Sequence, residues 1–398
     1  MLGIFIFLIT GTTIAIIYGR GYRFSFDNGK PDLSKTGLIA ATSIPEGAQV
    51  FINDELATAT DDTVNLAPGE YRVKIFKEGY FPWEKTVRVE EEVVTKANAL
   101  LLPTAPKLDS ITSIGVGTPT LDPTKTKIGY TVASQSAEKN GIYVYDINSN
   151  PVLSFQSVSK QIADDSTNLM SEAQISWSPN GEFIIATVSG ELSPATYVLK
   201  SREFNESPEL VNTATNQLLI EQQLEKEEKE ANTMKRLKKP LRELITNNFR
   251  IISWAPDEYK ILYQAVQSVN LPYLIKPRLI GINTITEDRD IKKDAIYVYD
   301  LKEDTNYKIL EGLPENCNLI TGSCDVPLKW MPDANHLIHV NNGRIDILEH
   351  DGTNRTTIYA GPFIGNYVFP WNNLDKIVML TNFNNKGVLP NLYTISLK

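Results

Sequence analysis

Cysteine, histidine and excess positive charge are all scarce in this sequence. Its 398 residues include two cysteines and three histidines, which is a poor supply for a structural zinc site that takes four such ligands. Lys and Arg number 39 against 48 Asp and Glu, a formal net charge of -9, and a surface that acidic repels nucleic acid phosphates. We therefore expect neither a metal site nor a nucleic acid partner.

Catalytic sequence motifs are absent as well. The chain has no Gly-x-Ser-x-Gly elbow, no His-Glu-x-x-His, no phosphate-binding P-loop and no Gly-x-Gly-x-x-Gly following a strand. We expect no catalytic residue and no cofactor. The overall composition is typical of a globular protein, with 42% hydrophobic and 22% charged residues. It excludes a fully disordered chain, a collagen and a polytopic membrane protein. Its length favours two or three folded units.

The N-terminus carries the one long apolar run. Residues Leu2 to Tyr18 contain no charge, and a helix of that length spans roughly 25 Å, the short end of the transmembrane range. The run continues into Arg20 without a small-x-small cleavage site. We expect a transmembrane anchor at 1–19 and a polar stalk at 20–36. A buried core helix is the alternative.

Residues 37–102 alternate short apolar runs with turn residues, which is typical of an antiparallel sheet or sandwich. Pro68-Gly69 and Lys77-Glu78-Gly79-Tyr80 supply turns, and Tyr71, Val73 and Ile75 alternate toward one face. A small β domain follows from this pattern.

The same segment resembles the PEGA family of small β domains. The resemblance is carried by Pro45, Glu46, Gly47 and Ala48, followed by Leu66-Ala-Pro-Gly-Glu-Tyr71 and the turn at 77–80. It implies a surface-exposed accessory domain, frequently beside a membrane anchor, with no catalytic residues to carry over.

Residues 103–398 contain an internal repeat. Trp-x-Pro begins at Trp177, Trp254 and Trp330, and an apolar pair starts seven residues after each Trp. Leu121-Asp-Pro123 keeps the spacing with Leu in place of Trp, and Trp371 begins a copy shortened by one residue. Each copy predicts a β meander, and such sheets stack around an axis. The repeat resembles TolB-like and WD-type β-propeller blades and predicts five recognisable blades.

Two insertions interrupt the repeats. The first insertion is 212–248. Its middle, residues 218–239, contains no Gly or Pro and places acids first and bases last, which matches a helix macrodipole and predicts a helix that ends or kinks at Pro240. Residues 268–293 contain proline and read as a loop. The fold class expected is therefore mostly β: a transmembrane helix, a PEGA-like sandwich and a propeller with a helical insertion.

Cys317 and Cys324 are separated by six residues in a polar segment. Because they are the only cysteines, a disulfide formed in an oxidising compartment is the better interpretation. His350-Asp351-Gly352 reads as a hairpin turn. The basic residues after the apolar run favour a cytoplasmic body by the positive-inside rule, whereas the cysteine pair favours the opposite orientation. We predict a single-pass protein of the cell membrane with its bulk extracytoplasmic.

Three functions remain open from the sequence. The leading hypothesis is a non-enzymatic binding or scaffolding protein of the cell envelope, in which the PEGA-like spacer presents the propeller to a protein or glycan partner. The second is a propeller enzyme acting on envelope glycans, which paired acids in the funnel would support. The third is a WD-type scaffold on the cytoplasmic face of the membrane.

Overall fold

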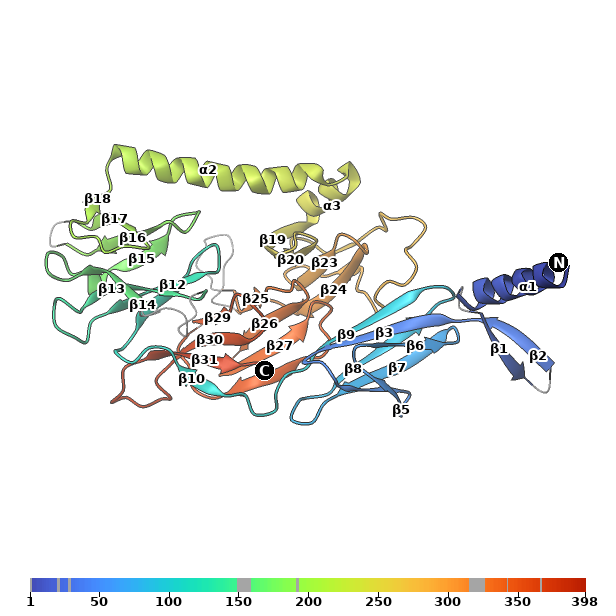
Figure 1. The fold of residues 1–398 in the computed structure, drawn as a ribbon. Coiled ribbons are helices and arrows are strands. Elements are labelled where there is room, and N and C mark those ends of the chain that lie inside the picture. The colour runs from blue at the N-terminus through green and yellow to red at the C-terminus, as the bar shows by residue number, and fades with distance from the viewer. Residues whose placement is uncertain are drawn as a thin grey trace.

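The computed structural model describes residues 2–19, 22–27, 30–148, 159–190, 193–314, 326–341, 343–365 and 367–398. Strands dominate these residues, and the chain runs from an N-terminal helix through a small sandwich into a larger set of sheets (Figure 1). Cys317 and Cys324 lie outside the described residues, so their expected disulfide stays a prediction.

The N-terminal region holds helix α1 (Leu2–Gly19) and a hairpin of strands β1 (Tyr22–Asp27) and β2 (Lys30–Lys35). The expected transmembrane anchor at 1–19 is wrong, and with it the single-pass membrane localisation: within the residues described, no helix combines the length and apolar character needed to cross a membrane. Helix α1 has 18 residues and rises about 27 Å, which is less than the hydrocarbon core of about 30 Å. The fold-class prediction fails at this element.

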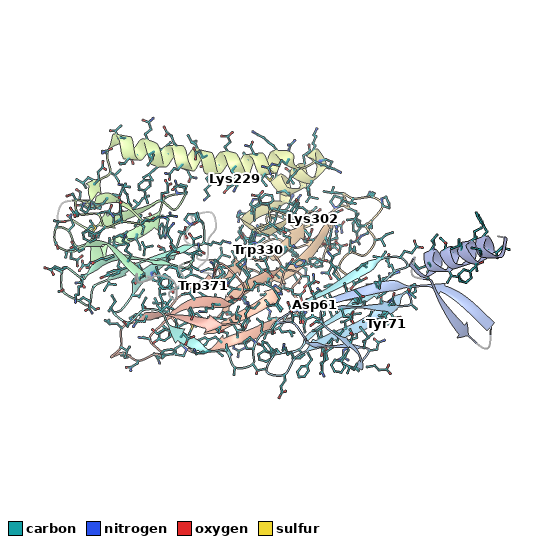
Figure 2. The ribbon with its side chains drawn as sticks, in the orientation of Figure 1. Asp61, Tyr71, Lys229, Lys302, Trp330 and Trp371 are labelled. Carbon is teal, nitrogen blue, oxygen red and sulfur yellow. The ribbon has the colours of Figure 1, made fainter. Side chains whose placement is uncertain are left out.

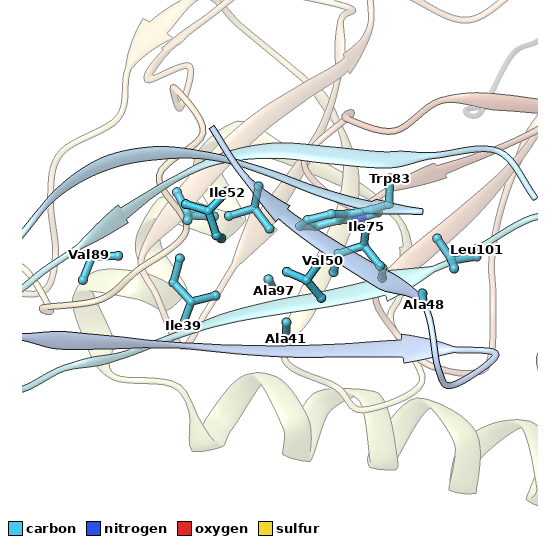
Figure 3. Close-up of a cluster of buried hydrophobic side chains, with 13 residues drawn as sticks. Ile39, Ala41, Ala48, Val50, Ile52, Ile75, Trp83, Val89, Ala97 and Leu101 are labelled. Carbon is cyan, nitrogen blue, oxygen red and sulfur yellow. The ribbon is translucent and has the colours of Figure 1, made fainter. Parts of the chain in front are cut away.

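The next unit is a sandwich of a three-stranded and a four-stranded sheet, ordered β6-β3-β9 and β5-β4-β7-β8. Its strands are β3 (Gly37–Ile44), β4 (Gln49–Ile52), β5 (Glu55–Ala59), β6 (Asp62–Leu66), β7 (Gly69–Phe76), β8 (Trp83–Val89) and β9 (Val94–Leu100). Alternate side chains of β3, such as Ile39 and Ala41, point into a core shared with Val50, Ile75 and Trp83 (Figure 3). The period-two pattern of the sequence thus becomes one buried face on each sheet.

The Pro45–Ala48 segment makes the turn from β3 to β4. Gly47 has a φ of +72°, which a residue without a Cβ adopts at no steric cost. Ala48 is fully buried, and its N–H donates to Thr60 Oγ1 at 2.9 Å. These residues are fold-making positions, and Glu46 stays exposed at the tip.

Five four-stranded sheets, called blades 1 to 5 below, make up the described part of residues 108–398. Blades 1 and 2 are β11 (Gly117–Leu121), β12 (Lys127–Val132), β13 (Gly141–Asp146), β14 (Ser159–Asp164) and β15 (Gln174–Trp177), β16 (Phe183–Val188), β17 (Ala195–Lys200), β18 (Glu209–Leu210). Blades 3 and 4 are β19 (Phe249–Trp254), β20 (Lys260–Ala265), β23 (Ile296–Asp300), β24 (Thr305–Leu310) and β25 (Leu328–Trp330), β26 (His336–Asn341), β27 (Arg344–Glu349), β28 (Thr356–Ala360). Blade 5 is β29 (Val368–Pro370), β30 (Lys376–Thr381), β31 (Asn391–Ser396) and β10 (Leu108–Ser110).

Blade 5 joins the two ends of this domain, because β10 from its start pairs with β31 from its end. Apolar clusters then connect the blades in the order 2-1-5-4-3. No such cluster joins blade 2 to blade 3 in the part of the chain that the structure describes. The strand β16 accordingly buries only alternate residues, whereas β20 in blade 3 is buried on both faces. Among the described residues, the ring of sheets is therefore open at this seam.

Residues 212–248 form helices α2 (Thr213–Arg236) and α3 (Lys239–Asn248). The Asn212 side chain accepts the Thr215 N–H at 3.0 Å and caps α2. The helix α2 runs from blade 2 to α3 beside blade 3 (Figure 1), and residues 223–231 in its middle are all exposed. Leu244 and Ile245 of α3 pack into the blade 3 core. The helix therefore bridges the open seam, and its middle contributes to neither blade.

Three of the repeated tryptophans lie between blades, and the fourth, Trp254, packs on blade 3 alone. Trp177 Nε1 donates to the Thr120 carbonyl of blade 1 at 3.2 Å, and Trp371 meets the Tyr145 ring of blade 1 edge to face, with ring centroids 6.1 Å apart. Trp330 is 3% exposed in the core between blades 3 and 4, and Trp254 packs against the blade 3 core. Figure 2 labels Trp330 and Trp371 inside the stack of sheets.

Candidate functional site: the interdomain cleft

A cleft of about 760 Å³ lies between the sandwich and the propeller, and we call it the interdomain cleft. One wall is formed by β8 and β9, and the opposite wall by the turns at one end of blades 3 and 4. The loop 281–284, from the second insertion, closes one side. The insertion also contains a short pairing of β21 (Val269–Asn270) with β22 (Asp290–Ile291). Asp61 of the sandwich lines the cleft at the junction of the two domains (Figure 2).

A buried ion network fastens the two walls together. The Lys85 ammonium of β8 lies 2.8 Å from Glu349 and 2.5 Å from Asp351 of blade 4, and these side chains are 10%, 9% and 0% exposed. Trp83, which lies on the same strand as Lys85, also donates its Nε1–H to the Glu349 carboxylate. A charged pair this buried is favourable only when its geometry is good and its remaining polar atoms are bonded. This contact therefore fixes how the domains sit against each other.

The electrostatics of the network favour its charged form. Burial alone would lower the pKa of Lys85, but Glu349 and Asp351 raise it above its usual value. Burial alone would likewise raise the pKa of Asp351, but Lys85 and His350 hold that pKa well below its usual range. Lys85 is therefore cationic and Asp351 anionic throughout the neutral pH range.

Further contacts surround this network. Asn283 Nδ2 donates to Asp351 at 2.6 Å, and Thr284 Oγ1 donates to the Thr86 carbonyl of β8 at 2.6 Å. The Glu84 N–H donates to Asn354 of blade 4 at 3.1 Å. The loop 281–284 thus ties blade 3 to the sandwich beside the ion network.

The apolar cores also meet. Leu101 points into the sandwich core, while Leu100 and Leu102 on either side of it pack with residues of blades 4 and 5. The last strand of the sandwich thus continues directly into the propeller core. Ionic and apolar contacts together make the sandwich and the propeller one structural unit in the described chain.

The propeller wall of the cleft carries paired charges. Lys260 lies 3.8 Å from Asp300, and His336 Nδ1 lies 2.5 Å from Asp333. Burial alone would lower the pKa of His336, but Asp333, Glu349 and Asp351 raise it above its usual value. Most carboxylates of this wall therefore have a cationic neighbour.

Glu303 is the exception on that wall. It accepts the Asn283 N–H at 3.2 Å, yet no ion pair involves it among the described residues. Burial and the neighbouring charge of Asp300 raise the pKa of Glu303, and the Asn283 N–H and the charges of Lys260 and Lys85, neither of which forms an ion pair with it, offset only part of that rise. A cation supplied by a ligand would relieve this half-buried carboxylate.

The site contains little that resembles a catalytic or metal centre. Within the described ranges, no group of three or more His, Cys, Asp or Glu side chains could hold a metal ion. The three histidines contact Asp333, the Asn335 carbonyl, and Asp346 with Arg355. None of them contacts a hydroxyl group in this part of the chain, so no described histidine is paired with a Ser or Thr nucleophile. The charged and hydrogen-bonding groups of the cleft can bind and orient a ligand.

The sequence pattern located some of these residues and missed others. Glu46 of the predicted turn lines the cleft, and His350-Asp351-Gly352 does form a turn after β27. The role of Asp351 as the counter-ion of Lys85 was not predicted. The available signal was Lys85 itself, because it lies two residues from both Trp83 and Val87 and so shares the strand face that these two direct into the core.

The fold and the cleft define a class of protein, a small β-sandwich docked on a propeller of five described blades. Comparison with family profiles then identifies the sandwich: residues 36–105 match the PEGA domain, so this part of the chain is a PEGA domain. A search of curated proteins finds no match.

Solved β-propellers are similar to the chain at low identity. A TolB candidate from Agrobacterium tumefaciens is 12% identical, with 70% of this chain and 78% of that chain covered and a TM-score of 0.22. TolB from Acinetobacter baumannii is 13% identical, with 82% and 59% covered and a TM-score of 0.20. The β-propeller domain of the Trilobed protease from Pyrococcus furiosus is 12% identical, with 91% and 96% covered and a TM-score of 0.21. These structural similarities carry no argument about function. The functional proposal depends on the interdomain cleft alone.

Proposed function

We propose that this chain is a non-catalytic binding protein and that the interdomain cleft is where its protein partner binds. The observation that carries the proposal is the joint construction of the cleft, since neither the PEGA domain nor the propeller forms it alone. A volume of about 760 Å³ lies in the range of specific binding pockets.

The rigidity of the cleft supports the same function. The buried contact of Lys85 with Glu349 and Asp351, and the loop contact of Thr284 with Thr86, hold the walls before any ligand arrives. A preformed site avoids the entropic cost of ordering its walls on binding. In this proposal the PEGA domain supplies half of the binding surface and is more than a spacer for the propeller.

A pair of matched variants tests the proposal. Thr42 and Thr63 are both exposed on the three-stranded sheet of the sandwich, but only Thr42 lines the cleft. The full chain, Thr42→Trp and Thr63→Trp would each be applied to arrays of immobilised peptides and of immobilised glycans.

We expect peptide binding that Thr42→Trp abolishes and Thr63→Trp preserves. Binding that both variants preserve would refute the assignment of the cleft. Binding to glycans alone, with the same dependence on Thr42, would refute a protein partner.

A further inference from the structure

β9 is an edge strand that lines the interdomain cleft. In its sheet it has one neighbour, β3, with which it pairs in parallel. Leu38 N–H donates to the Val93 carbonyl at 3.0 Å, and Leu101 N–H donates to the Ile44 carbonyl at 2.8 Å. Since residues of a strand direct their backbone groups alternately to either side, the odd-numbered residues of β9 bond to β3.

The even-numbered residues Val94, Lys96 and Asn98 direct their backbone N–H and C=O groups away from β3. No described hydrogen bond reaches these backbone groups, and all three residues line the cleft. Val94 is 50% exposed. A free strand edge of this kind is a template for pairing with another extended chain.

The charges across the cleft select among possible chains. Asp300 and Asp333 on the propeller wall already have Lys260 and His336 as partners. Glu303 on the same wall has no ion pair among the described residues. A Lys or Arg side chain of the incoming strand would therefore give the Glu303 carboxylate a cationic partner.

We infer that the cleft binds an extended peptide carrying a Lys or Arg residue, which pairs as an added strand with the free edge of β9. The seven residues of β9 span about 23 Å, the length of a short peptide segment. The cleft volume of about 760 Å³ admits such a segment but is too small for a folded domain. Backbone pairing would supply affinity and the basic residue would supply specificity, as in other cases of strand addition. The inference rests on the proposed function and specifies its ligand.

The test uses a fluorescein-labelled heptapeptide, Thr-Val-Thr-Lys-Thr-Val-Thr with blocked ends, titrated against the full chain by fluorescence anisotropy. Two N-methylated versions carry methyl groups on the amides of the odd or of the even positions. Only one set of peptide amides can face β9, so we expect one version to lose binding by about tenfold or more and the other to bind like the parent peptide.

Protein variants probe the same contacts from the other side. Lys96→Pro removes one outward N–H of β9 without removing a bond to β3, and Lys96→Ala removes the charge alone. We expect weaker binding for Lys96→Pro than for Lys96→Ala. Glu303→Gln should weaken the Lys peptide by about tenfold, while a peptide with Gln in place of Lys should bind both proteins equally weakly.

The outcomes separate the two proposals. Equal binding of the two N-methylated peptides, or no saturable binding of the parent peptide, would overturn strand addition. If array binding still depended on Thr42 in that case, the cleft would remain the binding site and its ligand would be of another kind. Array binding that is independent of Thr42 would instead refute the site itself. Lys96→Pro requires an unchanged circular dichroism spectrum, and the N-methylated peptides decide the matter if that variant does not fold.

Discussion

Replacing Lys85 by Met should uncouple the PEGA domain from the propeller. Lys85 is the cation between Glu349 and Asp351, at 2.8 Å and 2.5 Å. Met keeps most of the aliphatic length of the side chain and removes the charge. The variant would therefore bury two carboxylates that have lost their cationic partner.

The expected magnitude follows from the burial of the network. Removing one partner of a buried ion pair typically costs about 3–5 kcal/mol, because the remaining charge stays desolvated. The sandwich is small, and a domain of about 60 residues is marginal by itself. We expect the single cooperative unfolding transition of the wild-type chain to split, with the PEGA domain unfolding first.

A neutral triple variant separates charge from packing. Lys85→Met combined with Glu349→Gln and Asp351→Asn leaves no uncompensated charge, so it should recover more than half of the lost free energy of unfolding. Urea denaturation at pH 7, followed by far-UV circular dichroism and calorimetry, measures all three proteins. A change below about 0.5 kcal/mol for Lys85→Met, the size usual for surface substitutions, would show that the Lys85 charge does not stabilise the contact between the domains. So would a triple variant no more stable than the single one.

Acid titration gives an independent check on the same network. The pKa of Asp351 is held below its usual value of 3.8. Its contribution to stability is therefore present above about pH 4 and is lost as the pH falls toward the folded-state pKa. The wild-type chain should lose stability over this acid window, and Lys85→Met should show a shallower loss.

Three further predictions concern the propeller and its helix. Trp330→Ala should cost about 3–5 kcal/mol in urea denaturation, and Trp177→Ala should cost less, because Trp330 is buried and Trp177 is half-buried; equal costs would contradict the packing described. The pKa of His336 is raised above its usual value of 6.5, so its contribution to the free energy of unfolding is full below about pH 6.5 and is lost as the pH rises through the folded-state pKa. His336→Asn should therefore flatten the dependence of stability on pH between pH 6 and 9. An unchanged slope would count against the pairing of His336 with Asp333. Lys229→Pro lies in the exposed middle of α2 (Figure 2) and should reduce the helical circular dichroism signal, since proline costs about 3 kcal/mol in a helix interior. Amide exchange in the blade strands should stay unchanged. Faster exchange throughout blades 2 and 3 in this variant, but not in Lys229→Ala, would show that the helix stabilises the sheets.

Local patterns predicted much of the β architecture. The Trp-x-Pro spacing reports a strand end, a turn and a new strand, and such a turn is specified by adjacent residues. The five copies found in the sequence correspond to the five described blades. The Pro45–Ala48 segment is equally local, because Gly47 needs only its own positive φ.

Contacts between distant segments could not be predicted in this way. Lys85 and Glu349 are 264 residues apart, and the sequence around each residue does not indicate that the other is its contact partner. The open seam between blades 2 and 3 was also not predicted from the sequence. Its structural sign is β16, in which Phe183, Ile185 and Thr187 are half-buried and alternate with buried residues. The transmembrane interpretation failed on length, because the apolar run at the N-terminus forms a helix of 18 residues, which rises about 27 Å against a hydrocarbon core of about 30 Å.

The distance between the PEGA domain and the propeller should be fixed, because the contacts across the cleft make the two domains one rigid body. Spin labels attached through unnatural amino acids at Glu55, exposed on the sandwich, and at Lys302, exposed on blade 3, would report the distance between the domains by pulsed electron paramagnetic resonance. We expect one narrow distance distribution in the wild-type chain and a broad one in Lys85→Met. A broad or multiple distribution in the wild-type chain would contradict this expectation.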